Sequence, residues 1–495
     1  MHYYSTRDRA LRYTAAEAVK LGLSREGGLL TPTQIPQMDR AFLESLLTAD
    51  YQERAAQVMA LYLTDYTLDE LRSFAKNAYG PDKFDTPAVA PVRTVDESTH
   101  CLELWHGPTS AFKDMALQML PQLLSASLGK TGEDKTVCIL VATSGDTGKA
   151  AMEGFADVPQ TKILVFYPKD GVSAVQESQM VTQEGDNVGV CAVVGNFDDA
   201  QSGVKRIFSD PDIRQTLSER GYVLSSANSI NWGRILPQVV YYISAYCDLV
   251  RDGKLTMGDK VNFCVPTGNF GDILAAYYAG RMGLPVGKLI CASNRNDVLT
   301  DFLRTGVYDR NRPFHTTMSP SMDILISSNL ERLLFDLSGE NDEEVRGYME
   351  ALASQGRYQV SDQIRAGLDA AFWAGSCGEE DTASTIGRYY RDYGYLIDTH
   401  TAVAANVMEQ YRAATGDITP TVFVSTASPY KFCDSVLKAI GEVPVGDGVE
   451  LLDQLHAVTG TAVPRRLAAL RGKQRRFDLS CEKQAMDGVV LDFLK

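Results

Sequence analysis

Short apolar runs, separated in most cases by segments of helical length, recur along the middle of the chain. The runs are apolar at consecutive positions rather than at alternate ones, and they are rich in β-branched residues. Strands with this composition lie buried between two layers of helices. The expected strands are residues 137–142, 162–168, 188–195, 261–266, 288–293 and 421–425. The alternation predicts an α/β protein with doubly wound, mostly parallel sheets in two lobes.

Two helices and four regions follow from the same pattern. Residues 273–282 predict a helix, and so does an apolar stripe formed by Met115, Met119, Leu120, Leu123 and Leu124. We expect a mostly helical N-terminal region over 1–95, which ends in a proline-bearing segment, and α/β lobes over 96–300. Residues 301–400 are charged and rich in tyrosine, without clear strands, and predict a helical insertion or third lobe. Residues 401–495 return to the α/β core and form the C-terminal segment.

Composition narrows the class of protein. The 495 residues include 48 Lys+Arg and 63 Asp+Glu, for a net charge of −15, and 44% are hydrophobic. This excludes a disordered chain and argues against nucleic acid or an acidic membrane as the main partner. No apolar run approaches the ~20 residues that span a bilayer, and the first residues lack the apolar core of a signal peptide.

Cysteine and histidine spacing adds two expectations. The nine cysteines contain no C-x-x-C pair, which favours a reduced, cytoplasmic protein. The six histidines show no metal-ligand spacing, so we expect no metal site. Nothing in the sequence defines an oligomeric partner.

Three expected strand ends carry turns of small or hydroxyl residues. They are residues 142–151, 266–272 and 424–432, and the first two contain paired glycines. Ligands of open α/β sheets bind at the carboxyl ends of strands, where backbone N–H groups at helix starts face an anion. Ordinary helix capping or a tight turn is the alternative explanation for each of these turns. Neither a Rossmann G-x-G-x-x-G nor a Walker loop is present at these turns.

A lysine at an expected helix start is the fourth candidate. Lys113 lies between Phe112 and Asp114, just before the apolar stripe. A cation there opposes the helix dipole. A solvated lysine is the plain alternative, but a partly desolvated lysine with a lowered pKa is what Schiff-base chemistry needs.

Together these segments resemble pyridoxal-phosphate enzymes of fold type II, the tryptophan-synthase-β-like group, and within it the threonine synthase family of bacteria and fungi. The resemblance runs along nearly the whole chain. Its segments are residues 3–7, 17–19, 27–29, 106–114, 144–148, 228–234, 268–272, 319–324, 327–332, 398–404 and 425–432. Residues 319–324 (SPSMDI) and 327–332 (SSNLER) favour threonine synthases over serine dehydratases and cysteine synthases.

The resemblance implies pyridoxal 5'-phosphate as cofactor, and a lyase that converts O-phospho-L-homoserine and water to L-threonine and phosphate. It implies that Lys113 forms the Schiff base and then acts as general base at Cα and Cβ. Thr426 would face the pyridine nitrogen. The cofactor phosphate would bind at Gly268, Asn269, Phe270, Gly271 and Asp272. The substrate carboxylate would bind at Ser144, Gly145, Asp146 and Thr147.

The substrate phosphate needs a second anion site. We expect Arg234, with Ser229 and Asn231, because a guanidinium binds phosphate in a bidentate manner. A helix-surface ion pair is the alternative for Arg234. The chain departs from the family at Ser428, where many relatives have histidine. Two other functions stay open at this point: a phospho-lyase that releases a 2-oxo acid, and a nucleotide-binding or scaffold protein.

Overall fold

The computed structural model describes residues 1–495, apart from the side chain of Asp198. One lobe is built on a sheet of five parallel strands in the order β16-β8-β7-β6-β9. The strands are β6 (Thr136–Ala142), β7 (Thr161–Pro168), β8 (Val188–Val194), β9 (Tyr222–Ser225) and β16 (Ser480–Glu482). Its helices are α7 (Asp146–Phe155), α8 (Ala174–Val181), α9 (Phe197–Ser209), α10 (Pro211–Glu219) and α22 (Met486–Phe493). Three expected strands are confirmed here within a residue at each end.

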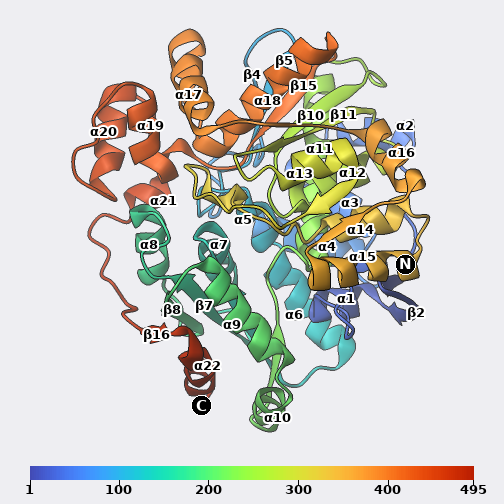
Figure 1. The fold of residues 1–495 in the computed structure, drawn as a ribbon, viewed down its shortest axis with the longest axis vertical. Coiled ribbons are helices and arrows are strands. Elements are labelled where there is room, and N and C mark those ends of the chain that lie inside the picture. The colour runs from blue at the N-terminus through green and yellow to red at the C-terminus, as the bar shows by residue number, and fades with distance from the viewer.

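The second lobe is built on a six-stranded sheet in the order β14-β11-β10-β15-β5-β4. Only β4 runs antiparallel to its neighbour. The strands are β4 (Val92–Thr94), β5 (Thr99–Glu103), β10 (Val261–Pro266), β11 (Val286–Ser293), β14 (Phe372–Ser376) and β15 (Thr421–Ser425). Its helices include α11 (Trp232–Arg251), α12 (Gly271–Arg281), α13 (Val298–Thr305) and α18 (Thr399–Thr415). Figure 1 shows this sheet at the upper right and the five-stranded sheet at the lower left. The expected doubly wound, mostly parallel architecture is confirmed.

The N-terminal region packs four helices beside a small antiparallel sheet of order β2-β1-β3. The strands are β1 (Tyr3–Ser5), β2 (Asp8–Tyr13) and β3 (Leu30–Pro32). The helices are α1 (Ala15–Leu21), α2 (Arg40–Leu46), α3 (Tyr51–Ala60) and α4 (Leu68–Ala78). Thr14 and Thr67 each begin a helix with a capping box, which fixes where α1 and α4 start.

Residues 301–400 contain strands, so the expectation of none was wrong. β12 (Val307–Asp309) and β13 (Arg357–Gln359) form an antiparallel pair, and β14 extends the six-stranded sheet. β12 and β13 have three residues each, too few to show a period, and β14 follows a helix without an intervening turn. The helices are α14 (Leu330–Leu337), α15 (Asp342–Gln355), α16 (Asp362–Ala371) and α17 (Glu379–Tyr393).

The remaining elements are short helices. The apolar stripe at 115–124 is divided between α5 (Lys113–Leu117) and α6 (Leu120–Thr131), and all five of its residues are buried. The C-terminal part has α19 (Cys433–Ala439), α20 (Glu450–Thr459) and α21 (Arg465–Ala468). The 3-10 helices are η1 (Pro320–Met322), η2 (Pro429–Phe432) and η3 (Lys483–Ala485). In the described chain, no helix combines the length and apolar character that crossing a membrane requires.

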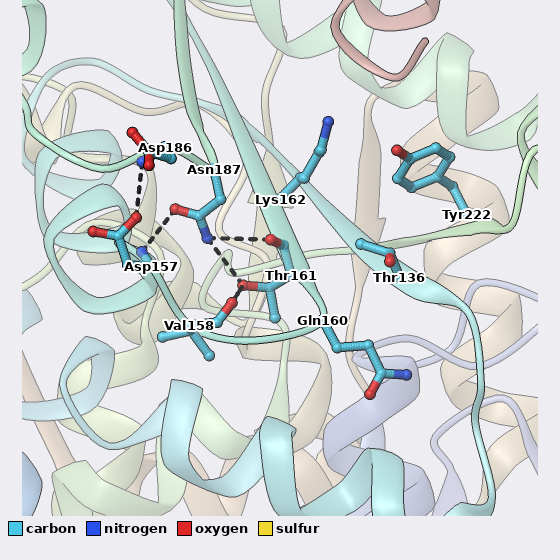
Figure 2. Close-up of a pocket in the computed structure, with 9 residues that line it drawn as sticks. All are labelled: Thr136, Asp157, Val158, Gln160, Thr161, Lys162, Asp186, Asn187 and Tyr222. Carbon is cyan, nitrogen blue, oxygen red and sulfur yellow. Dashed lines mark hydrogen bonds between the residues drawn. The ribbon is translucent and has the colours of Figure 1, made fainter.

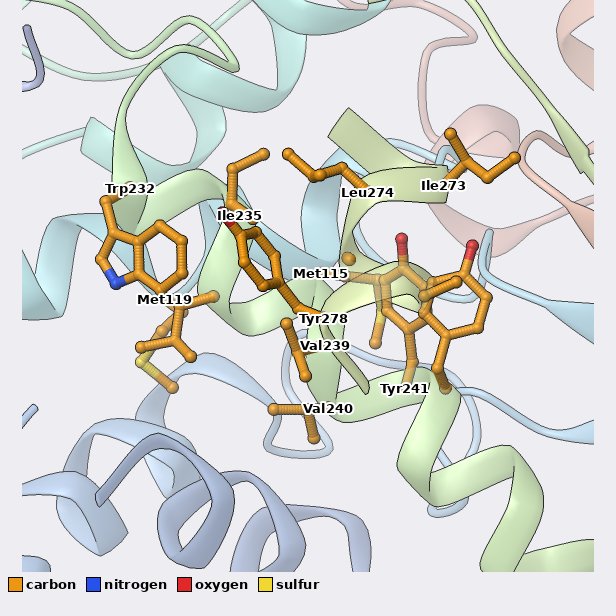
Figure 3. Close-up of a cluster of buried hydrophobic side chains, with 14 of the residues drawn as sticks. Met115, Met119, Trp232, Ile235, Val239, Val240, Tyr241, Ile273, Leu274 and Tyr278 are labelled. Atoms are coloured by element: carbon orange, nitrogen blue, oxygen red, sulfur yellow. The ribbon is translucent and has the colours of Figure 1, made fainter. Parts of the chain in front are cut away.

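One apolar cluster fixes the helices that carry the site. Met115 of α5, Ile235 of α11 and Leu274 of α12 are buried together with Trp232 and Tyr278, as Figure 3 shows. The Trp232 and Tyr278 rings meet edge to face with centroids 5.5 Å apart. Close packing of this kind holds helices in one relative position. It sets the starts of α5, α11 and α12 relative to one another.

Candidate active site

Lys113 is the first residue of α5, and the end of β15 holds the segment before it. The N–H of Phe112 donates to the carbonyl of Thr426 at 2.7 Å, and the N–H of Ser428 donates to the carbonyl of Ser110 at 3.0 Å. Asp114, fully buried, accepts from the N–H and hydroxyl of Thr109, both at 2.8 Å. These bonds place the backbone that leads into Lys113 beside residues 426–428.

Four charged side chains act on the amine of Lys113. Burial lowers the pKa of Lys113 to about 8, and Arg234 and Lys431 add to this effect, whereas Asp146 and Asp272 oppose it. The amine lies 4.7 Å from the centroid of the Phe112 ring. At neutral pH a lysine with this pKa has a useful fraction of free amine, as a nucleophile or general base needs.

The segment between β10 and α12 forms an N–H cradle. Phe270 has a positive φ of 63° and immediately precedes the first turn of α12. The carbonyls of Gly268 and Asn269 point away from the cradle. They accept hydrogen bonds from the Ser327 hydroxyl at 2.8 Å and the Asn329 amide at 3.1 Å, respectively. The first N–H groups of α12 have no acceptor within the helix. Such N–H groups bind an anion without a cationic side chain.

The side chain of Asp272 faces α11 rather than adding to this cradle. Its Oδ1 accepts from the Tyr241 and Tyr242 hydroxyls at 2.5 and 2.6 Å. Burial raises the pKa of Asp272 to about 6, and Oδ2 has no hydrogen-bond partner among the residues described. The N–H of Asp272, rather than its carboxylate, suits a phosphate ligand.

The segment 144–147 forms the start of α7 at the carboxyl end of β6. Gly145 has a positive φ of 126°, and the Thr143 hydroxyl accepts from the N–H groups of Gly145 and Gly148 at 3.0 and 2.9 Å. The carboxylate of Asp146 is ion-paired with Lys431 at 2.6 Å. Ser144 and Thr147 complete this turn.

Residues 229–234 lie beside the cradle at the start of α11. A Cβ on Gly271 would lie 3.7 Å from Cβ of Ser229. Asn231 caps α11, since its Oδ1 accepts from the N–H of Gly233 at 2.9 Å and its amide donates to the carbonyl of Val19 at 3.0 Å. Both polar atoms of Asn231 therefore bind the chain itself, and its predicted contact with substrate stays a prediction.

Arg234 is buried, so the surface ion pair considered from the sequence does not form. Its Nη1 donates to the carbonyl of Ala227 at 2.5 Å, and Nε has no partner in the described part of the chain. Burial lowers the pKa of Arg234 to about 10. A buried guanidinium with an unsatisfied donor costs folding free energy unless an anion accepts the missing hydrogen bond.

Sequence reasoning missed two features of the site. Lys431 belongs to the 425–432 motif without a predicted role of its own, although its side chain is buried against Asp146. The segment 321–329 covers the cradle, since the carbonyl of Ser321 would lie 2.9 Å from a Cβ on Gly268. Two signals in the sequence could have indicated these features. Lys431 lies between two aromatic residues, and several serines lie close together within residues 319–328.

One hollow in the surface is not part of this site. It has a volume of about 360 Å³ and lies at the amino ends of β6, β7 and β9, lined by residues such as Thr136, Thr161 and Tyr222. Figure 2 shows the Asn187 amide bonded to Thr161 in its wall. The candidate site lies at the opposite, carboxyl ends of the strands, where ligands of α/β sheets bind.

The residues present fit pyridoxal phosphate. The cradle suits a dianionic phosphate, Lys113 supplies an amine for the carbonyl, and Thr426 supplies a hydroxyl nearby. Family models agree: residues 101–427 match "Pyridoxal-phosphate dependent enzyme", residues 2–79 match "Threonine synthase N terminus", and residues 401–489 match "Threonine synthase, C-terminal". Fold and site thus define a pyridoxal-phosphate-dependent enzyme.

Individual relatives narrow the class. Threonine synthase of Pseudomonas aeruginosa is 41% identical over 90% of this chain and 92% of its own length. The structure of PLP-bound threonine synthase from Brucella melitensis has a TM-score of 0.88, with 37% identity and complete coverage of both chains. Human threonine synthase-like 1 is 41% identical over 86% of this chain, which spans only 58% of that relative. The chain belongs to the threonine synthase family.

Proposed function

We propose that this chain is a threonine synthase, which converts O-phospho-L-homoserine and water to L-threonine and phosphate in the last step of threonine biosynthesis. The observation that carries the proposal is the position of Lys113, whose pKa of about 8 is set by burial and by charges on four segments that surround it. Each of those segments matches one that the family resemblance assigns to substrate or cofactor. The identity to threonine synthases over nearly full length supports the same conclusion.

Each segment has a task in the proposed reaction. The N–H groups of residues 268–272 hold the cofactor phosphate, and the hydroxyl of Thr426 faces the ring nitrogen. The start of α7 at 144–147 orients the substrate carboxylate. Arg234 and Ser229 hold the phosphate that leaves from Cγ. Pyridoxal phosphate, when bound, supplies the electron sink for carbanions of the substrate.

Lys113 moves the protons. Its amine removes one proton from Cα and then one from Cβ, and phosphate leaves from Cγ with the bonding electron pair. Cγ takes up a proton and becomes the methyl group, the hydroxyl of water adds at Cβ while the water proton is released, and a proton returns to Cα, which completes threonine. One amine serves both carbons because its tether keeps it within reach of adjacent atoms.

We also propose a cytoplasmic location and a division of the chain into the four regions 1–95, 96–300, 301–400 and 401–495. The nine cysteines are free, eight of them buried, which suits a reducing compartment.

Product analysis tests the proposal. Purified protein reconstituted with pyridoxal phosphate is incubated with O-phospho-L-homoserine, and we expect equal amounts of L-threonine and phosphate. Release of 2-oxobutyrate with phosphate would identify a phospho-lyase instead. Lys113→Ala should abolish turnover, whereas full activity of that variant would reject the role of Lys113.

A further inference from the structure

A second buried lysine lies next to Lys113. The side chain of Lys431, in η2, is 0% exposed, and its Nζ lies 2.6 Å from Oδ1 of Asp146, itself 3% exposed. The same Nζ donates to the carbonyl of Thr109 at 2.9 Å. Thr109 is fixed by its two bonds to Asp114. The ammonium group is therefore held in one place between a carboxylate and a carbonyl.

The pair joins the two lobes at the site. Asp146 follows β6 of the five-stranded sheet, and Lys431 follows β15 of the six-stranded sheet. A buried ion pair gains little stability over apolar residues of the same size, because both charges lose their hydration. The stability of the fold therefore does not explain why Lys431 and Asp146 form a buried ion pair here.

The position of Asp146 raises an electrostatic problem. Asp146 is the first residue of α7, in the segment expected to hold the substrate carboxylate. An uncompensated carboxylate there would repel that anion and cancel the attraction of the helix N-terminus. Although burial opposes its ionisation, Lys431 and Lys113 hold the pKa of Asp146 below its ordinary value, so Asp146 carries its charge at neutral pH.

We propose that Lys431 neutralises Asp146 so that the start of α7 can accept the α-carboxylate of an amino-acid substrate. Lys431 is then a positioning residue that sets selectivity for an anionic substrate, acting through Asp146. The inference rests on the proposed function, because it concerns the carboxylate of that substrate.

The same pair affects Lys113. Asp146, Asp272, Arg234 and Lys431 are the charged groups that act on the Lys113 amine. Without Lys431, the charge of Asp146 would act on Lys113 uncompensated and would favour its protonated form. This gives the proposal a consequence that can be measured without substrate.

Steady-state kinetics of the holoenzyme provide the first test. In Lys431→Met, the KM for O-phospho-L-homoserine should rise roughly 10- to 100-fold, the range for a lost charged contact, with a smaller change in kcat. Asp146→Asn in the same chain should bring the KM back to within about threefold of the original, because the two sites are directly coupled. An unchanged KM in Lys431→Met, or a double variant no better than the single one, would overturn the proposal.

A pH titration of the cofactor absorbance provides the second test. The midpoint should move to higher pH in Lys431→Met and return in the double variant. The control is Lys149→Met, which breaks the pair between Lys149 and Glu153 at 3.0 Å on the same helix. Its midpoint should stay in place, so a shift there equal to that of Lys431→Met would show a structural effect and refute the proposal. The titration needs no turnover, so it remains decisive if threonine is not the product.

Discussion

Gly268→Ala would add one methyl group to the cradle at its tightest point. An ideal Cβ there would lie 2.9 Å from the carbonyl oxygen of Ser321 and 3.4 Å from Cα of Met322. Both are backbone atoms. The N–H of Ser321 is held by Nε2 of His400 at 3.2 Å, and His400 is held by Asp398 at 2.7 Å. The covering segment therefore cannot withdraw without breaking these bonds.

The expected loss follows from this overpacking. An extra methyl group in a closely packed place costs about 1–3 kcal/mol. If the strain falls on the arrangement that binds phosphate, the Kd for pyridoxal phosphate rises roughly 5- to 140-fold, at 1.4 kcal/mol per factor of ten. The fold itself should persist, because Gly268 has no positive φ that alanine would strain.

Titration of the apoprotein with pyridoxal phosphate, followed by visible absorbance, measures this Kd. The matched control is Gly271→Ala in the same turn, where the nearest atoms are the side-chain ends of Ile235 at 3.3 Å and Asn329 at 3.4 Å. Gly347→Ala is a second control, because nothing lies within 4 Å of its Cβ position. The reasoning fails if Gly268→Ala binds the cofactor as tightly as both controls do.

Three further predictions test other parts of the account. Uptake of pyridoxal phosphate by the apoprotein should accelerate as pH rises through about 8, since deprotonation of Lys113 frees the amine; a half-rise near pH 10 would contradict the lowered pKa. Arg54→Met should lower the free energy of unfolding in urea by about 3–5 kcal/mol, because it breaks the buried ion pair with Asp248 at 2.7 Å. The decrease should be smaller in the double variant Arg54→Met/Asp248→Leu, which leaves no unpaired carboxylate. Arg234→Ala should raise the KM for O-phospho-L-homoserine far more than the Kd of the cofactor; equal losses would make Arg234 a cofactor or folding residue.

The inner strands could be predicted from the sequence because they are buried on both faces. β6, β7 and β10 are short, mostly apolar runs, and burial follows directly from that composition. β5 is equally buried but reads Thr-His-Cys-Leu-Glu, so its polar residues conceal it. Its place in the sheet comes from pairing with β15, more than 300 residues away, which no local pattern records.

Those parts of the site could be predicted in which one short segment by itself carries the residue types that the chemistry needs. Lys113 and the glycine turn at 268–271 each stand out in the sequence. The partners of these segments could not be found in this way, because Lys431 meets Asp146 across two lobes, and the cover over Gly268 comes from residue 321. The side-chain bonds of Asp272 to Tyr241 and Tyr242 likewise arise only when α11 packs against α12.

The proposed function depends most directly on one covalent bond, which the amine of Lys113 forms with the carbonyl carbon of the cofactor. Borohydride reduction of the reconstituted protein, followed by digestion and mass spectrometry, locates the lysine that carries the cofactor. We predict the added mass on the peptide containing Lys113. Labelling of Lys431, the other buried lysine at this site, or an unlabelled protein would contradict the account.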